Sequence, residues 1–298
     1  MLRNALKSVV TAAVLLMPTV GAAQMTIEER FAPGQPPVVL AKRAKGFGNP
    51  DNSLAGIQNA IDRGVDMVEL SLQPTLDGQY IMVRETRLTD ITNVADVYPD
   101  GAPSLAGSTL ARRNLTSDYT LEEISHLKMK DPYGGNHPVP DLDTVMEMTK
   151  GRIMIEMFLR RWDVDTLASA LSRHDTSGIV LFAERQDDSK LAETAKLTGI
   201  GVMTYLNFGD PVIQFEKDLE KFGQHLALVM ATNTHLTPQL EELARYHGVP
   251  IVTNGAAYQD EDAAYKAGDL GPWREVLKNG TQGFRTKFPD EVLTLLGR

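Results

Sequence analysis

The sequence predicts an α/β fold, a TIM (β/α)8 barrel with a small loop-rich insertion over the barrel mouth. Three observations support this fold class. Short apolar runs alternate with helix-like stretches, which favours a parallel sheet covered by helices. The length of 298 residues suits one barrel of this kind. Residues 89–130 are rich in turn-forming residues and interrupt the alternation, which indicates the insertion.

The predicted strands succeed one another along the whole chain. They are Val38–Ala41, Met67–Leu72, Tyr80–Val83, Ile153–Met157, Ile179–Ala183, Gly201–Tyr205, Leu226–Met230, Pro250–Thr253 and Gly283–Thr286. These nine candidates exceed the eight strands of a closed barrel, so at least one of the strand assignments is open to question. The linker at residues 73–79 is too short to hold a helix. A doubly wound open sheet is the alternative, but the sequence has no GxGxxG loop and no P-loop.

The first residues have the pattern of an export signal. In residues 1–23, basic residues precede an apolar run that ends in small residues. The run is short for a membrane span, so we expect a cleaved signal peptide and no stable membrane anchor after cleavage. An uncleaved anchor is the alternative. The mature protein would be periplasmic or secreted, with a polar leader at 24–37 and the barrel at 38–298.

Composition excludes several classes of function. The chain has no cysteine, which rules out disulfides, thiolate catalysis and cysteine metal sites. Its net charge of −9 argues against a nucleic-acid partner, because such binders need a cationic surface. Without a dinucleotide or P-loop motif, we expect no nucleotide cofactor. A small anionic substrate in a locally cationic pocket stays possible, and the sequence does not indicate an oligomeric state.

Two carboxylates occupy apolar strands. Glu69 and Ser71 share one face of their strand and should point into the barrel, near the strand ends where barrel enzymes place their sites. Glu156 lies in a second apolar strand. A buried lone carboxylate is costly, so each needs a cation or a metal. Cations at the predicted strand ends that could serve are Lys42, Arg43, Arg84 and Lys287.

Such an arrangement is compatible with more than one chemistry. Carboxylates surrounded by cations suit a divalent metal with a phosphate, or an anionic ligand without metal. Two carboxylates could also hydrolyse a glycoside while the cations hold an acidic sugar. A purely structural role for Glu69, paired with a neighbouring cation, is a further alternative. Arg185, which follows the fifth predicted strand, is a further candidate for the pocket wall.

The order of short motifs resembles the glycerophosphodiester phosphodiesterases, a TIM-barrel family. The resemblance spans residues 38–296 and implies a barrel with a small insertion over its mouth. The matching segments are "AKRA" at 41–44, "PDNS" at 50–53, "TLDG" at 75–78, "VPDLDTV" at 139–145, "MIEM" at 154–157 and "GFRTKFPDEVLTLL" at 283–296.

The resemblance implies a chemistry that this chain alters. The family uses two histidines as general acid and base, and a divalent metal on three carboxylates. Lys42 and Arg84 stand at the histidine positions. Glu69 and Glu156 match two of the metal ligands, and Ser71 stands at the third. The resemblance therefore implies candidate catalytic residues Lys42, Arg84, Glu69 and Glu156, and a weakened Ca²⁺ or Mg²⁺ site at most.

Other positions carry over as substrate contacts. Arg43 matches a phosphate-binding arginine, and Glu85 follows Arg84 where the family has aspartate. With Arg185 and Lys287 they form the predicted substrate-binding set. Lysine has an ordinary pKa of about 10.4 and arginine stays protonated, so we do not expect the two-histidine mechanism. We expect an exported protein that acts on or recognises a phosphodiester, such as a glycerophosphodiester, with altered machinery. The alternatives are a non-catalytic periplasmic anion- or phosphodiester-binding protein, and a carboxylate-based glycoside hydrolase or lyase.

Overall fold

Of the 298 residues in the chain, the computed structural model describes 26–45, 48–131, 134–256, 261–278 and 281–298. The predicted signal peptide at 1–23 lies outside the described residues. None of the described helices is long and apolar enough to cross a membrane.

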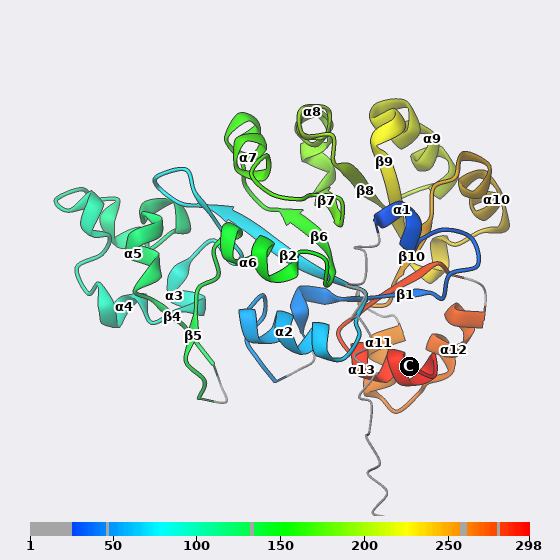
Figure 1. Cartoon of the computed structure of the whole chain (residues 1–298), viewed down its shortest axis with the longest axis horizontal. Helices are drawn as coiled ribbons and strands as arrows, with labels where there is room; N and C mark the ends of the chain where they lie inside the picture. The colour runs from blue at the N-terminus through cyan, green and yellow to red at the C-terminus, as the bar shows by residue number, and fades with distance from the viewer. Residues whose placement is uncertain (1–25, 46–47, 132–133, 257–260, 279–280) are drawn as a thin grey trace, which may run out of the picture.

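A closed ring of parallel strands forms the body of the protein. Among the described residues, its eight strands are β1 (Val38–Ala41), β2 (Met67–Pro74), β6 (Met154–Leu159), β7 (Ile179–Ala183), β8 (Gly201–Leu206), β9 (Leu226–Ala231), β10 (Ile251–Asn254) and β11 (Gly283–Thr286). They pair in the order β1-β11-β10-β9-β8-β7-β6-β2, and pairing of β1 with β2 closes the ring. Figure 1 shows helices around the outside of the ring. The predicted TIM barrel is confirmed, and the open-sheet alternative was wrong.

The extra predicted strand lies outside the barrel. β3 (Tyr80–Ile81) pairs antiparallel with the end of β2, with Gln73 opposite Ile81. Between them the chain reverses through Gly78, whose φ of +72° lies in the left-handed region that favours glycine. The segment predicted as Tyr80–Val83 is therefore the second arm of a hairpin, because a tight turn without a helix precedes it.

Helices follow the strands and pack on the barrel wall through a large apolar cluster. Ser53 begins the first of them, where its Oγ accepts a hydrogen bond from the Gly56 backbone N–H at 3.1 Å. The described helices of this outer layer are α2 (Leu54–Asp62), α6 (Leu142–Thr149), α7 (Val164–Leu171), α8 (Asp188–Thr198), α9 (Pro211–Phe222), α10 (Pro238–His247), α11 (Glu261–Lys266), α12 (Gly271–Lys278) and α13 (Pro289–Leu295).

Apolar side chains fill the N-terminal end of the barrel. The leader contains the short helix α1 (Ile27–Arg30), and the Ile27 backbone N–H donates a hydrogen bond to the Ser177 carbonyl just before β7. Ile27 and Phe31 belong to one apolar cluster with inward-facing residues of seven barrel strands. Because this end is closed by an apolar floor, the polar side chains gather at the opposite, C-terminal end.

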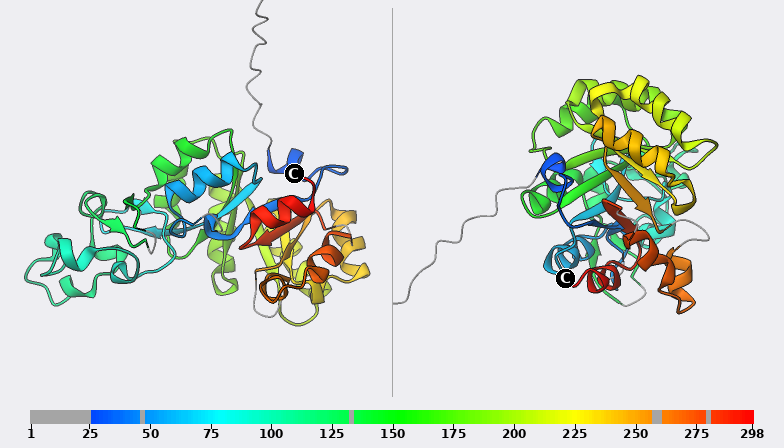
Figure 2. Two further views of the ribbon diagram at one scale, coloured as in Figure 1. Left: turned by 90° about the horizontal axis from the view of Figure 1, so that it is seen from below. Right: turned by 90° about the vertical axis from the view of Figure 1, so that its right-hand side faces the viewer.

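An insertion leaves the barrel after β3 and returns before α6. Its elements pack around an apolar cluster of their own, separate from the barrel core. They are α3 (Leu88–Ile91), α4 (Val94–Val97), α5 (Leu121–Ser125), β4 (Lys128–Met129) and β5 (His137–Pro138). Figures 1 and 2 show the insertion at one end of the molecule, opposite the helices α11 and α12. It therefore extends the barrel mouth to one side.

Candidate active site

Three charged side chains meet inside the barrel, above the apolar floor. Glu69 on β2 and Glu156 on β6 are register partners on neighbouring strands. Arg285 reaches them from β11: its Nη2 contacts Oε2 of Glu69, and its Nε lies 3.4 Å from Oε2 of Glu156. Both carboxylates are fully buried, and the guanidinium is 5% exposed. We refer to Glu69, Glu156 and Arg285 as the buried ionic cluster.

The cation that contacts both carboxylates lies inside a strand, whereas the cations expected to do so lie at the strand ends. Arg285 alternates with Phe284 and Thr286, so it shares the inward face of β11 with Gly283. The signal that sequence reasoning missed is a basic residue at an inward-facing position of an otherwise uncharged strand. The resemblance also matches this position to isoleucine in the family motif, so Arg285 is a departure as marked as Lys42.

These residues, as arranged, do not fit a divalent cation. The guanidinium contacts both carboxylates that would hold the ion. Ser71, at the third position, is buried, and its hydroxyl has no hydrogen-bond partner in the described part of the chain. Nowhere in the described residues do three or more histidines, cysteines, aspartates or glutamates come together to hold a metal. The expected Ca²⁺ or Mg²⁺ site at Glu69, Glu156 and Ser71 therefore gains no support from this geometry.

Lys42 follows β1 and lies half-buried at the top of the barrel. Its Nζ donates a hydrogen bond to the Ala256 carbonyl at 3.4 Å. Burial, together with the nearby charges of Arg285, Arg43 and Lys287, lowers the pKa of Lys42 to about 7. This lysine can therefore gain or lose a proton near neutral pH, as an unperturbed histidine does.

Glu156 is the less compensated of the two carboxylates. Burial raises the pKa of Glu156 to about 8, and the positive charge of Lys42 opposes this rise. The Arg285 guanidinium makes its closer contact with Glu69, which is consistent with a proton on Glu156 near neutral pH. The charges of Lys42 and Glu156 therefore affect each other's pKa.

The loop after β1 holds Arg43 in an uncommon conformation. Its φ of +58° lies in the left-handed region, which costs on the order of 1 kcal/mol for a residue other than glycine. Arg43 Nη1 is 2.8 Å from Asp51 Oδ2, and its carbonyl accepts a hydrogen bond from the Asn52 backbone N–H. The Asn52 side chain in turn accepts from the backbone N–H of Ser71 at 3.0 Å. Arg43 is thus tied to this loop, and the loop is tied to β2.

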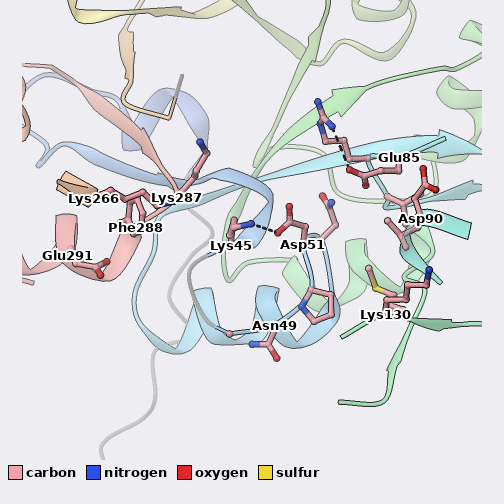
Figure 3. A pocket seen from close by; sticks show the side chains of 17 residues that line it. Lys45, Asn49, Asp51, Glu85, Asp90, Lys130, Lys266, Lys287, Phe288 and Glu291 are labelled. Atoms are coloured by element: carbon pink, nitrogen blue, oxygen red, sulfur yellow. Dashed lines mark ion pairs between the residues drawn. The ribbon is translucent and has the colours of Figure 1, made fainter. Parts of the chain in front are cut away.

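A pocket of about 670 Å³ opens beside this loop at the barrel mouth. Arg84 and Lys287, both predicted site residues, lie in its wall with Glu85, which is 3.5 Å from Arg84. Figure 3 shows Lys287 on one side of the pocket and Glu85 on the other. The charged lining residues are Lys45, Asp51, Arg84, Glu85, Asp90, Lys130, Lys266, Lys287 and Glu291. The insertion, through Asp90 and Lys130, supplies part of the wall.

Among the predicted substrate-binding residues, Arg43 is not part of the wall of this pocket, and Arg185 lies elsewhere. It forms an ion pair with Asp218 at 3.0 Å and donates to the Tyr205 carbonyl. It lines a separate pocket of about 330 Å³ beside Phe208, after β7 and β8. Its charge is already paired with the buried carboxylate of Asp218. Arg185 therefore stabilises the fold and is not part of the main pocket.

Comparison with known proteins agrees with this architecture. The model of the glycerophosphoryl diester phosphodiesterase family matches residues 43–207. A glycerophosphodiester phosphodiesterase of Caldanaerobacter subterraneus is 23% identical over 280 residues, covering 87% of this chain and 97% of that protein. A putative glycerophosphodiester phosphodiesterase of Bacillus subtilis is 26% identical over 113 residues, 37% of this chain and 39% of that one.

Solved structures share the fold at low identity. A glycerophosphoryl diester phosphodiesterase from Parabacteroides distasonis has a TM-score of 0.68 and 16% identity over 93% of each chain. An Oleispira antarctica phosphodiesterase, solved with its product sn-glycerol-3-phosphate, has a TM-score of 0.63 and 16% identity, with 88% of this chain and 97% of that one covered. The matched family model spans more than half of the sequence, so the chain belongs to the glycerophosphoryl diester phosphodiesterase family.

Proposed function

We propose that this protein is an exported member of its family that acts on a phosphodiester, such as a glycerophosphodiester, with Lys42 and Arg84 in place of two histidines. The observation that carries the proposal is the meeting of cations from different strand ends at one pocket. Arg84 follows β3 and Lys287 follows β11, yet both line this pocket. Lys42 lies close enough to Lys287 for that charge to lower its pKa. A phosphodiester carries the single negative charge that such a pocket can hold.

The proposed chemistry assigns one titratable group and two fixed charges. Neutral Lys42 Nζ would accept a proton from the attacking hydroxyl as its oxygen bonds to phosphorus, and the resulting ammonium would return a proton to the departing alcohol oxygen. Arg84 and Lys287 would stabilise the charge on the phosphoryl oxygens. The lowered pKa of Lys42 supports this role, because a base works best near ambient pH.

The buried carboxylates do not favour glycoside hydrolysis. Glu69 and Glu156 both contact Arg285 and are fully enclosed. A glycosidase needs two carboxyl groups on either side of a substrate bond, with one of them free to donate a proton. Within the described residues, a guanidinium lies between them instead.

The test is release of glycerol 3-phosphate from glycerophosphocholine by the purified mature protein, with synthetic aryl phosphodiesters as a second panel. Turnover should fall sharply in Lys42→Met and persist in Lys217→Met, a matched change at an exposed lysine of α9. Equal turnover in Lys42→Met and the wild type would overturn the role of Lys42. The proposal would be overturned if the protein neither bound nor turned over any of the diesters tested.

Non-catalytic phosphodiester recognition is the second candidate. Arg84 favours it, because a guanidinium stays protonated and cannot exchange a proton with the substrate. Calorimetric binding of glycerophosphocholine without turnover, weakened in Arg84→Met, would select this function.

A further inference from the structure

We infer that Arg285 is a built-in cation that takes the position of a divalent ion between Glu69 and Glu156, so that this barrel keeps its fold and its charge balance without metal. The inference deepens the proposed function, on which it rests for the importance of the site. Its test measures metal binding and stability with no substrate present, so its failure is distinguishable from failure of the proposed function.

The contacts of the two carboxylates carry the first step. In the described part of the chain, no hydroxyl, amide or backbone N–H donates a hydrogen bond to either of them. Both lie against the guanidinium instead, with no exposed surface. A buried carboxylate with no hydrogen-bond donor and no cation strongly destabilises the folded state. The burial of these two glutamates therefore depends on Arg285.

The guanidinium is held in place by neutral groups on other strands. Its Nη1 donates to the Asn254 Oδ1 on β10 at 3.4 Å. The Asn254 Nδ2 donates to the Tyr205 hydroxyl on β8 at 2.9 Å. Arg285 therefore belongs to a network that crosses the barrel interior, and its orientation toward the carboxylates is supported from the opposite side.

The charge balance carries the second step. The metal site that the resemblance implies has three carboxylates and one divalent cation, a net charge of −1. Here Ser71 removes one negative charge, and Arg285 supplies one positive charge where the ion would supply two. Two carboxylates and one guanidinium sum to −1 when both glutamates are ionised, and to 0 when Glu156 holds a proton. Either sum lies within one charge of the metal site, so the two departures from the family pattern offset each other, as expected if one cation has replaced another.

The experiment compares wild type, Arg285→Met and Arg113→Met in thermal unfolding, each with EDTA or with millimolar CaCl₂ or MgCl₂. Arg113 is the matched control, because its guanidinium pairs with one buried carboxylate, that of Asp118, which alone cannot hold a divalent ion. Each comparison is made at more than one pH, because metal ligands must lose their protons to bind the ion.

We expect the wild-type midpoint to be the same in EDTA and in either ion. Arg285→Met should melt roughly 10 °C lower, and Ca²⁺ should recover at least about 2 °C of that loss. Arg113→Met should be destabilised without recovery. Calcium binding by calorimetry should appear in Arg285→Met and be lost when Glu69→Gln is added.

Two results would overturn the inference. One is stoichiometric Ca²⁺ or Mg²⁺ binding to the wild type that Glu156→Gln abolishes. The other is an Arg285→Met variant whose stability ignores both ions. If Arg285→Met does not fold, Glu69→Gln/Arg285→Met removes one charge of each sign and should fold with no response to metal. A calcium response in that double variant would also contradict the inference.

Discussion

The buried ionic cluster and the pocket at the barrel mouth contain the same kinds of side chains in opposite surroundings. Inside the barrel, Glu69 and Glu156 face one guanidinium that is 5% exposed. At the mouth, Arg84 is 40% exposed and lies 3.5 Å from a partly exposed Glu85. Buried charges depend on one partner geometry, whereas water and salt screen exposed ones. The comparison indicates that the cluster maintains the fold and that the mouth is free to exchange partners with a ligand.

Lys42 lies between these two regions and connects them. It is half-buried, and the charges of both Arg285 below and Lys287 at the pocket lower its pKa. A change in either region should therefore register in the protonation of Lys42. Substitutions in the cluster and at the pocket can therefore be compared by their effects on stability and on ligand binding.

Loss of the buried cation should have the largest effect on stability. Arg285→Met leaves two enclosed carboxylates without the guanidinium that contacts both, so the free energy of unfolding should fall by about 3–5 kcal/mol. Arg84→Met, at the exposed ion pair, should change it by less than about 1 kcal/mol. Urea unfolding of both variants measures the difference. Equal effects would mean that burial does not separate the two regions.

Turnover should depend most on Lys42. Lys42→Met should lower kcat/KM for a glycerophosphodiester by at least about 100-fold, because the group that exchanges the proton is lost. In the wild type, kcat/KM should rise with pH through about 7, as Lys42 loses its proton. In Arg285→Met, if it folds, the rise should move to higher pH, since a charge that lowers the pKa of Lys42 is gone. If the pH dependence of kcat/KM is unchanged in Arg285→Met, the charge of Arg285 does not set the pKa of Lys42.

Glu156 should make stability depend on pH. Its pKa rises from the ordinary 4.5 to about 8 on folding, so its contribution to stability is complete below pH 4.5 and is lost as pH rises through 8. Glu156→Gln should therefore flatten the decline in unfolding free energy between about pH 5 and 8. Urea unfolding at these two pH values measures it. A decline of the same size in the variant would assign the effect to other groups.

The smallest effect should be found at the rim. Arg84→Met should raise the dissociation constant for glycerophosphocholine by roughly tenfold, which corresponds to the loss of one charged hydrogen bond. Its thermal midpoint should stay within about 2 °C of the wild type. Arg112→Met, at an exposed arginine of the insertion, is the control and should change neither quantity. A loss of stability equal to the loss of binding would place Arg84 in the fold instead of the ligand site.

The architecture could be predicted because it depends on local patterns. Apolar runs and helix-like stretches alternate along the chain, and each predicted barrel strand is present within one or two residues of its expected bounds. The inward position of Glu69 followed from the alternation of side chains along its strand, and in the structure Glu156 is its register partner on β6. The family could also be predicted from the order of short motifs, because this order depends only on the residues and their spacing.

Which charges meet was decided by the tertiary structure alone. Arg285 is more than 120 residues from either glutamate in sequence, and only closure of the barrel brings β11 close to β2 and β6. The same closure places Arg84 and Lys287 in one pocket and leaves Arg185 in another. A sequence states the signs of its charges, but burial and distance set their pKa values and partners, and both arise only when the ring is complete.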